Sequence, residues 1–348
     1  MESTGSRTVA LWLMLCCLMV LATLIVGGAT RLTHAGLSIV EWQPIVGTVP
    51  PVSAADWQEV FEKYQRTPEY QKVNTRMTLE EFKPIFWWEF VHRVLGRSIG
   101  LVFLLPMVYF LLRGRLSLAL LPRLVGIFAL GAAQGGMGWY MVQSGLVDDP
   151  RVSQYRLTAH LGLAFVIFAA MFWLALGLLT PRRRLRASIS PPALTTLRRL
   201  SVALAGLVLV MALSGGLVAG LHAGLRYNSF PLMHGDLVPP DVFLMEPWAV
   251  NFFNNPSTAQ FDHRMLAWLL LLVVGYLWFK VQQAALALRT RRAIHVFLLL
   301  FAVQLSLGIA TLLLVVPVPL AVAHQAGAML LFGAALWVCH ELRVDSGI

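Results

Sequence analysis

Charge is scarce in this sequence. Only 13% of its 348 residues are charged, whereas 58% are hydrophobic. A soluble globular domain carries about 25% charged residues, so the composition excludes that class and favours the lipid bilayer as the solvent. Cysteine is also rare, and Cys16, Cys17 and Cys339 all lie in or beside apolar stretches. We therefore expect no disulfide in the loops outside the membrane.

Eight apolar stretches are long enough to cross a bilayer, which takes about 20 residues of helix. Backbone N–H and C=O groups find no water in hydrocarbon, so each stretch must form a helix rather than an irregular segment or an open strand. The sequence thus predicts an all-α integral membrane protein with eight transmembrane helices. The stretches lie at 9–28, 90–112, 124–142, 157–179, 200–221, 262–281, 294–316 and 320–340.

Acidic residues are fewer than basic ones, 17 against 27, which gives a net charge of +10. The basic clusters at 113–123, 181–199 and 289–292 each follow an even-numbered predicted helix, and most acids lie in the odd-numbered connections. The positive-inside rule therefore predicts that both termini and the basic connections are cytoplasmic. Topology and contact with membrane lipid account for the charge, so we expect no nucleic-acid partner. The first apolar stretch has no clear cleavage site and no transit peptide, which favours a bacterial inner membrane.

The second half of the sequence repeats landmarks of the first half in the same order. Such ordered self-similarity is typical of a duplicated four-helix unit. Four helices separate the copies, so we expect two tandem, pseudo-symmetric four-helix bundles related by an axis along the membrane normal. The expected units are an N-terminal bundle at 1–180, a basic cytoplasmic linker at 181–199 and a C-terminal bundle at 200–348. The landmarks are "GGATRLTHAGL" (27–37) with "GGLVAGLHAGL" (215–225), "EFVHR" (89–93) with "QFDHR" (260–264), "AQGGMG" (133–138) with "VQLSLG" (303–308) and "TAHLGLAF" (158–165) with "VAHQAGAM" (322–329).

Four of the nine histidines lie in the first turns of predicted helices that enter from the outer side, two in each bundle; they are His92, His160, His263 and His324. Two imidazoles that face each other across a bundle can ligate haem iron, so we expect one haem per bundle near the extracytoplasmic face. A di-iron site would need four inward carboxylates, and zinc would need three or four clustered ligands, and the sequence offers neither set. His34 and His222 match in the repeat but fall in or beside loops, where the sequence assigns them no role.

Four arginines lie near these histidines in the predicted topology; they are Arg31, Arg93, Arg226 and Arg264. Haem propionates are anionic and guanidinium binds carboxylate in bidentate fashion, so these arginines are candidate propionate ligands. The alternative is that they are ordinary interfacial arginines that reach toward lipid headgroups.

One carboxylate distinguishes the two copies. Glu89 precedes His92 by three residues and shares its helix face, whereas the second copy has Gln260 at that position. We expect Glu89 near the edge of the macrocycle, where a buried carboxyl group can carry a proton. Gln260 has a similar shape but cannot ionise, so the N-terminal site should be reactive and the C-terminal site an electron relay. The alternative is that Glu89 faces water at the membrane interface.

The ordered motifs together resemble the haem A synthase family over essentially the whole chain, in the proteobacterial and mitochondrial branch that lacks an outer-loop cysteine pair. The resemblance implies that a ring methyl group of haem O is oxidised to a formyl group to give haem A, with water as the oxygen source. It also implies that His92 and His160 hold the substrate haem, that Glu89 is catalytic, and that His263 and His324 ligate a resident haem b. The motifs that carry it are "GGATRLTHAGLSIVEWQPIVGTVPP", "EFVHRVLGR", "AQGGMGWYMV", "TAHLGLAF", "NSFPLM" and "FDHR".

The resemblance further implies a haem O synthase as substrate donor, cytochrome oxidase or its assembly factors as recipient of haem A, and an electron acceptor of unknown identity. Two other functions remain open on the residues alone. One is a di-haem b-type membrane electron-transfer protein, and the other is a haem transporter or assembly factor. Neither explains why only one copy of the repeat keeps the carboxylate.

Overall fold

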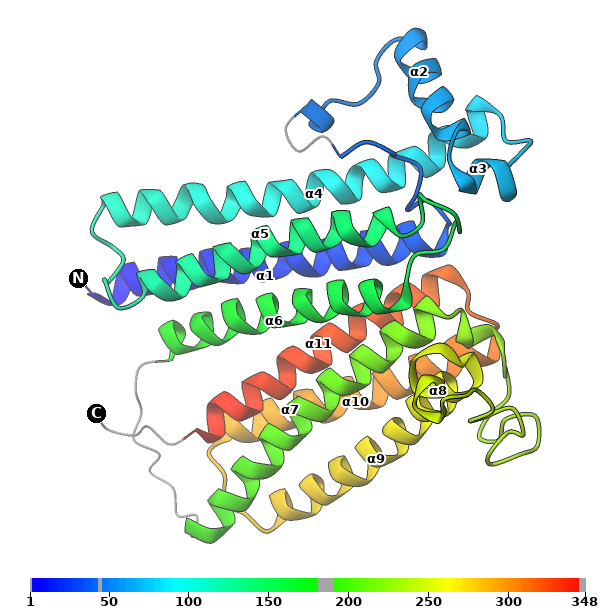
Figure 1. Cartoon of the computed structure of the whole chain (residues 1–348). Helices are drawn as coiled ribbons and strands as arrows, with labels where there is room; N and C mark the ends of the chain where they lie inside the picture. Colours follow the sequence, from blue (N-terminus) through cyan, green and yellow to red (C-terminus); the bar gives the residue numbers. More distant parts are fainter. Residues whose placement is uncertain (1, 43–45, 181–190, 344–348) are drawn as a thin grey trace.

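A computed structural model describes residues 2–42, 46–180 and 191–343, and this part of the chain is helical, with one isolated β-bridge between Met233 and Asp236. The long helices run side by side (Figure 1). They are α1 (Glu2–Leu32), α4 (Leu79–Leu112), α5 (Leu121–Gln143), α6 (Gln154–Leu179), α7 (Pro191–Gly220), α9 (Pro256–Gln282), α10 (Leu288–Leu313) and α11 (Val318–Leu342). The all-α membrane fold predicted from composition is confirmed.

Seven of these helices are long and apolar enough to cross a membrane, and α5 is the one left out. The α5 sequence contains five glycines together with Arg123, Gln134 and Gln143, which lowers its hydropathy although its length is sufficient. The helix α5 packs on α6 and α4, as the neighbouring ribbons in Figure 1 show. Eight membrane crossings therefore stay a prediction, of which seven are supported.

The helix α4 begins at Leu79, well before the expected start near residue 90. Thr78 caps it: its side-chain oxygen accepts from the Glu81 N–H, and the Glu81 carboxylate accepts from the Thr78 N–H. His92 therefore lies in the fourth turn, and the prediction that it occupies a first turn is wrong. The prediction fails in the same way for the other three, which lie in the second or third turn of their helices; they are His160, His263 and His324.

The helix α7 also begins early, at Pro191. Within the expected linker at 181–199, residues 191–199 are thus helical, and residues 181–190 lie outside the described part of the chain.

Equivalent helices of the repeat make equivalent contacts. In the first half, α1 packs on α4 and α6, and α5 packs on α6; in the second half, α7 packs on α9 and α11, and α10 packs on α11. The halves meet where α6 contacts α7, where α1 contacts α11 and where α6 contacts α11. Phe165 of α6 and Phe332 of α11 pack there with tilted rings whose centroids are 5.5 Å apart.

Small residues allow the close approach of helices at this interface. A Cβ atom on Gly28 would lie 2.6 Å from the Gln325 side chain, and a Cβ atom on Gly216 would lie 3.0 Å from Thr158 Oγ1. Gly28 and Gly216 occupy the same position in the repeat. Membrane helices associate through such close packing, because lipid offers no hydrophobic drive for apolar side chains to meet.

Two short helices, α2 (Ala54–Gln65) and α3 (Pro68–Lys72), cover one end of the first half, and α8 (Asn251–Asn254) lies at the same end of the second half (Figure 1). We call this the loop end. Aromatic side chains attach α2 and α3 to the start of α4, with Tyr64 and Phe82 rings 5.0 Å apart. The chain termini lie at the opposite end (Figure 1).

Candidate functional site

The four predicted ligand histidines form two pairs. His92 on α4 interacts electrostatically with His160 on α6, and His263 on α9 interacts with His324 on α11. The pairs are therefore those expected from the repeat, one pair in each half. Each imidazole is partly buried among the long helices.

A glycine on a neighbouring helix lies directly against each of these imidazoles. A Cβ atom added at Gly27, Gly138 or Gly308 would lie too close to the Cε1 atom of the ring for the ring to keep its present position, whereas at Gly215 it would make an ordinary van der Waals contact. These glycines occupy matched positions in the repeat, Gly27 with Gly215 and Gly138 with Gly308. The contact with an imidazole gives a physical reason for their presence in the repeated motifs. The distances are 2.5 Å for Gly27 to His92, 3.1 Å for Gly138 to His160, 3.4 Å for Gly215 to His263 and 2.8 Å for Gly308 to His324.

The ring nitrogens are arranged unequally. His263 Nδ1 lies 2.6 Å from Ser214 Oγ. His92 lies beside the Thr23 carbonyl and His324 beside the Gln304 carbonyl, and in neither case does Nδ1 make a hydrogen bond of good geometry. In metal sites the ring nitrogen that does not bind the metal commonly faces a carbonyl or hydroxyl group, so these three rings fit coordination through the other nitrogen. His160 differs, because its Nε2 atom lies 3.4 Å from Gln134 Nε2.

Two glutamines brace the ligand helices. Gln134 Nε2 donates to the His160 carbonyl at 3.1 Å, and Gln304 Nε2 donates to the His324 carbonyl at 2.9 Å. The two glutamines are equivalent in the repeat and fix α5 on α6 and α10 on α11. Both halves thus hold their second histidine in the same way.

The Glu89 side chain is buried, with 3% of its surface exposed. Its Oε1 atom accepts from Arg93, 2.5 Å from Nη2 and 3.0 Å from Nε. Its Oε2 atom accepts from Ser38 Oγ at 2.7 Å and from the Ile39 N–H at 2.8 Å. The alternative that Glu89 faces water is therefore wrong. Glu89 also interacts electrostatically with His92, which places a carboxylate beside the first imidazole pair.

Gln260 is equally buried but has a different environment. Its Nε2 atom donates to the Tyr227 carbonyl at 3.0 Å, and its Oε1 atom has no hydrogen-bond partner. A buried amide oxygen without a donor cannot substitute for a carboxylate that accepts several hydrogen bonds. The two positions are therefore similar in placement and different in chemistry.

Arg93 and Arg264 hold the loops that follow α1 and α7. Arg93 donates to the carbonyls of Ile39, at 2.6 Å, and Glu41, at 2.9 Å. Arg264 donates to the carbonyls of Tyr227, at 2.8 Å, and Ser229, at 2.9 Å. These four acceptors are also equivalent in the repeat. The contact of either arginine with a haem propionate stays a prediction.

The other two candidate arginines differ from each other. Arg31 lies in the last turn of α1 rather than in a loop, and it donates to the Ala219 carbonyl on α7. Arg226 follows the short helix η2 (Ala223–Leu225) and pairs with Asp241 at 3.3 Å. The contact of Arg31 or Arg226 with a haem propionate also stays a prediction.

Comparison with known proteins shows the family of the chain. Residues 10–336 match the family described as cytochrome oxidase assembly protein, COX15-CtaA. The chain belongs to the COX15-CtaA family. A relative from Nitrosospira multiformis is 60% identical over 337 residues, which cover 97% of this chain and 94% of the relative. A relative from Nitrosomonas eutropha is 58% identical over 96% of this chain and 93% of the relative. A relative from Paramagnetospirillum magneticum is 53% identical over 97% of this chain and 94% of the relative. All three are named heme A synthase.

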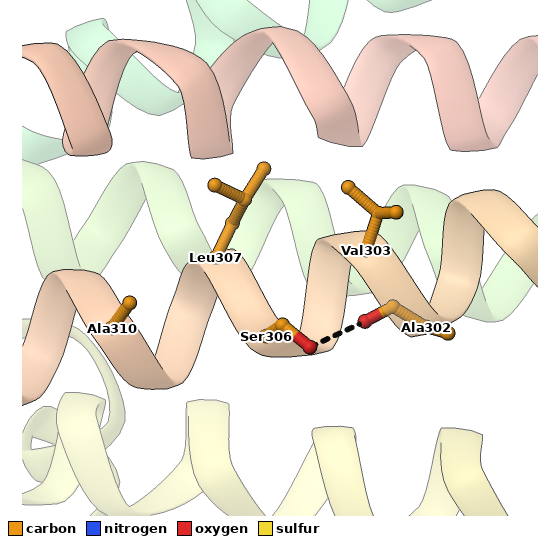
Figure 2. Close-up of a pocket in the computed structure, with 5 residues that line it drawn as sticks. All are labelled: Ala302, Val303, Ser306, Leu307 and Ala310. Carbon is orange, nitrogen blue, oxygen red and sulfur yellow. Dashed lines mark hydrogen bonds between the residues drawn. The ribbon is translucent and has the colours of Figure 1, made fainter.

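An open apolar cavity of about 390 Å³ lies along α10 in this COX15-CtaA member (Figure 2). Its lining includes Ala302, Leu307 and Ser306, whose Oγ atom donates to the Ala302 carbonyl at 2.9 Å. Leu307 also lies against Gly327 of α11. The helices α9 and α10 make few contacts, so the α10 surface that lines the cavity is left uncovered by α9. The same helix carries Gly308, which lies against His324.

Sequence reasoning missed one acidic residue near Glu89. Glu69 in α3 is 6% exposed, and its Oε2 atom accepts from the Tyr64 hydroxyl at 3.2 Å. Burial, with a smaller contribution from the charge of Glu89, raises the pKa of Glu69 to about 7 against the lowering effect of the Tyr64 hydrogen bond. Glu69 lies in a polar segment, "RTPEYQK", so no hydrophobic pattern could have indicated its burial.

Proposed function

We propose that the chain is a haem A synthase, an oxidoreductase that oxidises a ring methyl group of haem O to a formyl group and so produces haem A. The observation that carries the proposal is identity of 53–60% to relatives of that name over nearly the whole chain. The family description supports a place in the assembly of cytochrome oxidase. A haem O synthase is the proposed substrate donor, and cytochrome oxidase or its assembly factors are the proposed recipients.

The proposed architecture is two pseudo-symmetric four-helix bundles with eight membrane crossings in a bacterial inner membrane. Equivalent helix contacts in the two halves support it. Both termini lie opposite the loop end (Figure 1), and we place them in the cytoplasm by the positive-inside rule. The loop end is then extracytoplasmic, and the imidazole pairs lie toward it.

His92 and His160 are the proposed ligands of the substrate haem O, and His263 and His324 those of a resident haem b. Haem b, when bound, supplies reversible electron uptake whose potential depends on its ligands and their surroundings. The chain's contribution is positional. The backbone of a neighbouring glycine limits the position of each imidazole. In His92, His263 and His324 the ring also lies beside a carbonyl or hydroxyl group of a neighbouring helix, which leaves the opposite ring nitrogen for iron.

Glu89 is the proposed proton carrier. Conversion of a methyl group to a formyl group with oxygen from water releases four protons with four electrons, so the reactive site needs a nearby base. Arg93 holds Glu89 Oε1, and Ser38 Oγ lies 2.7 Å from Oε2. A proton can therefore reach or leave Oε2 through the Ser38 hydroxyl without movement of the carboxylate. Gln260 has no such capacity, so the second site transfers electrons only.

The test is co-expression with a haem O synthase in a host that makes no haem A, followed by chromatography of the extracted haems. We expect haem A from the wild-type chain. Glu89→Gln installs the amide of the second site, so it should retain haem b, accumulate haem O and form no haem A. His263→Ala should remove the haem b spectrum. Haem B alone from the wild-type chain would instead favour the di-haem electron-transfer protein.

A further inference from the structure

The proposed reaction requires an electron acceptor, and this inference rests on that proposed function. Each haem A formed releases four electrons, and a haem b held by His263 and His324 would be the group that passes them on. A lipid-soluble quinone takes up two electrons and two protons to become a quinol. The balance closes as R–CH3 + H2O + 2 quinone → R–CHO + 2 quinol, so the protons released by the methyl group equal those that the quinone consumes.

A second cavity, of about 420 Å³, lies between α7, α8 and α9 at the loop end. Its lining is mostly apolar and aromatic, including Val210, Phe252 and Phe253, with two polar side chains, Ser214 and Asp262. Small-molecule sites in proteins are commonly apolar cavities of about 300–1,000 Å³ with a few placed polar groups. This cavity has that size and that composition.

The cavity directly adjoins the second imidazole pair. Ser214 Oγ lies in the cavity wall, donates to the Met211 carbonyl at 2.9 Å and lies 2.6 Å from His263 Nδ1. Because its own proton goes to Met211, the hydroxyl oxygen accepts from the imidazole N–H. One hydroxyl group therefore separates the cavity from a proposed haem b ligand.

The first half of the chain lacks the polar groups of this cavity. The positions equivalent to Ser214 and Asp262 are Val26 and Val91. The position equivalent to Ala259, a small residue in the cavity wall, is Trp88. The cavity chemistry is thus confined to the half that lacks the carboxylate and that we assign to electron transfer.

We propose that this cavity binds the ring of a lipid-soluble benzoquinone or naphthoquinone, which accepts electrons from the second haem site. At its rim, Val210 of α7 is 48% and Phe253 of α8 is 47% exposed. Because α7 is long and apolar enough to cross a membrane, the exposed surface at Val210 can face lipid, so entry from the bilayer suits a lipid-soluble acceptor. Phe252 and Phe253 offer faces for stacking a ring. A quinone carbonyl can accept from Ser214 Oγ–H once that hydroxyl turns from Met211.

The test uses full-length protein carrying its haem, in detergent micelles, with a short-chain azido-benzoquinone as photolabel. We expect the label in peptides that contain 210–217 and 252–266, and its displacement by excess decyl-benzoquinone. Val210→Trp fills the cavity and should weaken labelling at least tenfold, a change worth about 1.4 kcal/mol of binding free energy. Reoxidation of reduced haem b by decyl-benzoquinone should slow to a similar degree.

The matched control is Ala22→Trp, which places the same side chain at the equivalent exposed position of α1. It should leave labelling and reoxidation unchanged. If Val210→Trp does not fold, Leu266→Phe narrows the same cavity, with Leu95→Phe as its control, and is judged by the same thresholds.

Three results would overturn the proposal. They are label in other peptides, equal labelling of the cavity variant and the wild-type chain, and displacement by phospholipid but not by decyl-benzoquinone, which would make the cavity a lipid site. Haem extraction separates this inference from the proposed function. A chain that makes haem A but shows any of these results refutes only the quinone site, whereas a chain that makes no haem A refutes the proposed function.

Discussion

The imidazole rings of His34 and His222 lie parallel, 6.5 Å apart with an interplanar angle of 7°. The two residues occupy the same position in the two copies of the repeat. A residue can lie beside its own counterpart only near a pseudo-two-fold axis. Arg31 and Ala219, which are also counterparts, are hydrogen-bonded close by. The two halves therefore meet at the loop end through equivalent residues at and just beyond the ends of α1 and α7.

The first prediction concerns the pH dependence of this contact. Partial desolvation lowers the pKa of His222, whose surface is still exposed, and the charges of Arg31, His34 and Arg151 lower it further. Above about pH 6.5 the imidazole is neutral in the folded and unfolded chain alike, and as the pH falls below this value the unfolded chain gains the proton first. Stability should therefore decrease as the pH is lowered. Melting of detergent-solubilised protein measures it.

The variant His222→Gln should melt with a weaker dependence on acid pH than the wild-type chain. The control is His295→Gln on α10, whose ring lies beside Trp278 instead of a second histidine. An unchanged acid dependence in His222→Gln would show that another group controls it. Haem spectra should be the same in both variants, since neither His222 nor His295 is one of the four proposed haem ligands.

The second prediction separates the two roles considered for Arg93 and Arg264. Lysine keeps the charge but cannot donate to two backbone carbonyls through a planar fork. Arg264→Lys should therefore expose the loop at 226–242 to protease, with a loss of about 1–3 kcal/mol for unsatisfied buried acceptors. Arg93→Lys should do the same for the loop segments at 38–42 and 46–52. Limited proteolysis with mass mapping measures both.

Arg151→Lys is the control, because Arg151 pairs with Asp149 on an exposed surface. If the arginines acted chiefly on haem propionates, haem would be lost from the lysine variants while their loops kept wild-type resistance to protease. That result would contradict the loop-holding role.

The repeat explains how much of the site was predictable. His92, His160, His263 and His324 could be paired from sequence because each recurs at a matched position and imidazole has few roles in a membrane. Glu89 could be singled out because its counterpart is an amide. Composition alone predicted the helical membrane fold, since apolar stretches of that length have one stable conformation in lipid.

Other features depend on contacts between distant segments and leave no local signal. The polar first turns of α4 hid its true start at Leu79, which misplaced His92 by several turns. Nothing in "GGATRL" indicates that Gly27 lies against an imidazole 65 residues later, because a glycine in a helix is usually explained by helix packing alone. Likewise, the carbonyls bound by Arg93 are set by the loop's path and not by its side chains.

The third prediction concerns Glu69. Its raised pKa means that the folded chain resists ionisation, so the unfolded chain loses the proton first as the pH rises from about 4.5 to about 7. The α2–α3 region should therefore be most stable at acid pH and lose up to roughly 3 kcal/mol by pH 7, with no further change from this group above it. Hydrogen exchange of residues 54–74 measures it.

Glu69→Gln keeps an acceptor for the Tyr64 hydroxyl but cannot ionise. In this variant the amide hydrogens of residues 54–74 should exchange more slowly than in the wild-type chain at neutral pH, and at the same rate at about pH 4.5. The control is Glu62→Gln on the exposed side of α2, which should leave the profile unchanged. A steeper loss of protection in Glu69→Gln at neutral pH would mean that the ionised carboxylate stabilises this region.

The fourth prediction concerns the glycines that lie against the ligand imidazoles. A methyl group should displace each ring according to the space available, at a cost of about 1–3 kcal/mol where it overlaps. Gly27→Ala should disturb its site most, then Gly308→Ala and Gly138→Ala, and Gly215→Ala least, because the distances rise from 2.5 to 2.8, 3.1 and 3.4 Å. The measurement is the low-spin electron paramagnetic resonance signal of the haem in each half, which reports ligation by two imidazoles.

Gly100→Ala and Gly136→Ala are the controls, since a Cβ atom at either position meets nothing within 4 Å. Alanine is the better helix former by about 1 kcal/mol, so these two variants should keep both signals and melt no lower than wild type. Loss of helix flexibility would affect all six variants alike, whereas ring displacement affects them in the order of the distances. A Gly27→Ala protein that keeps its low-spin signal while Gly215→Ala loses it would contradict the role of these glycines in holding the ligands.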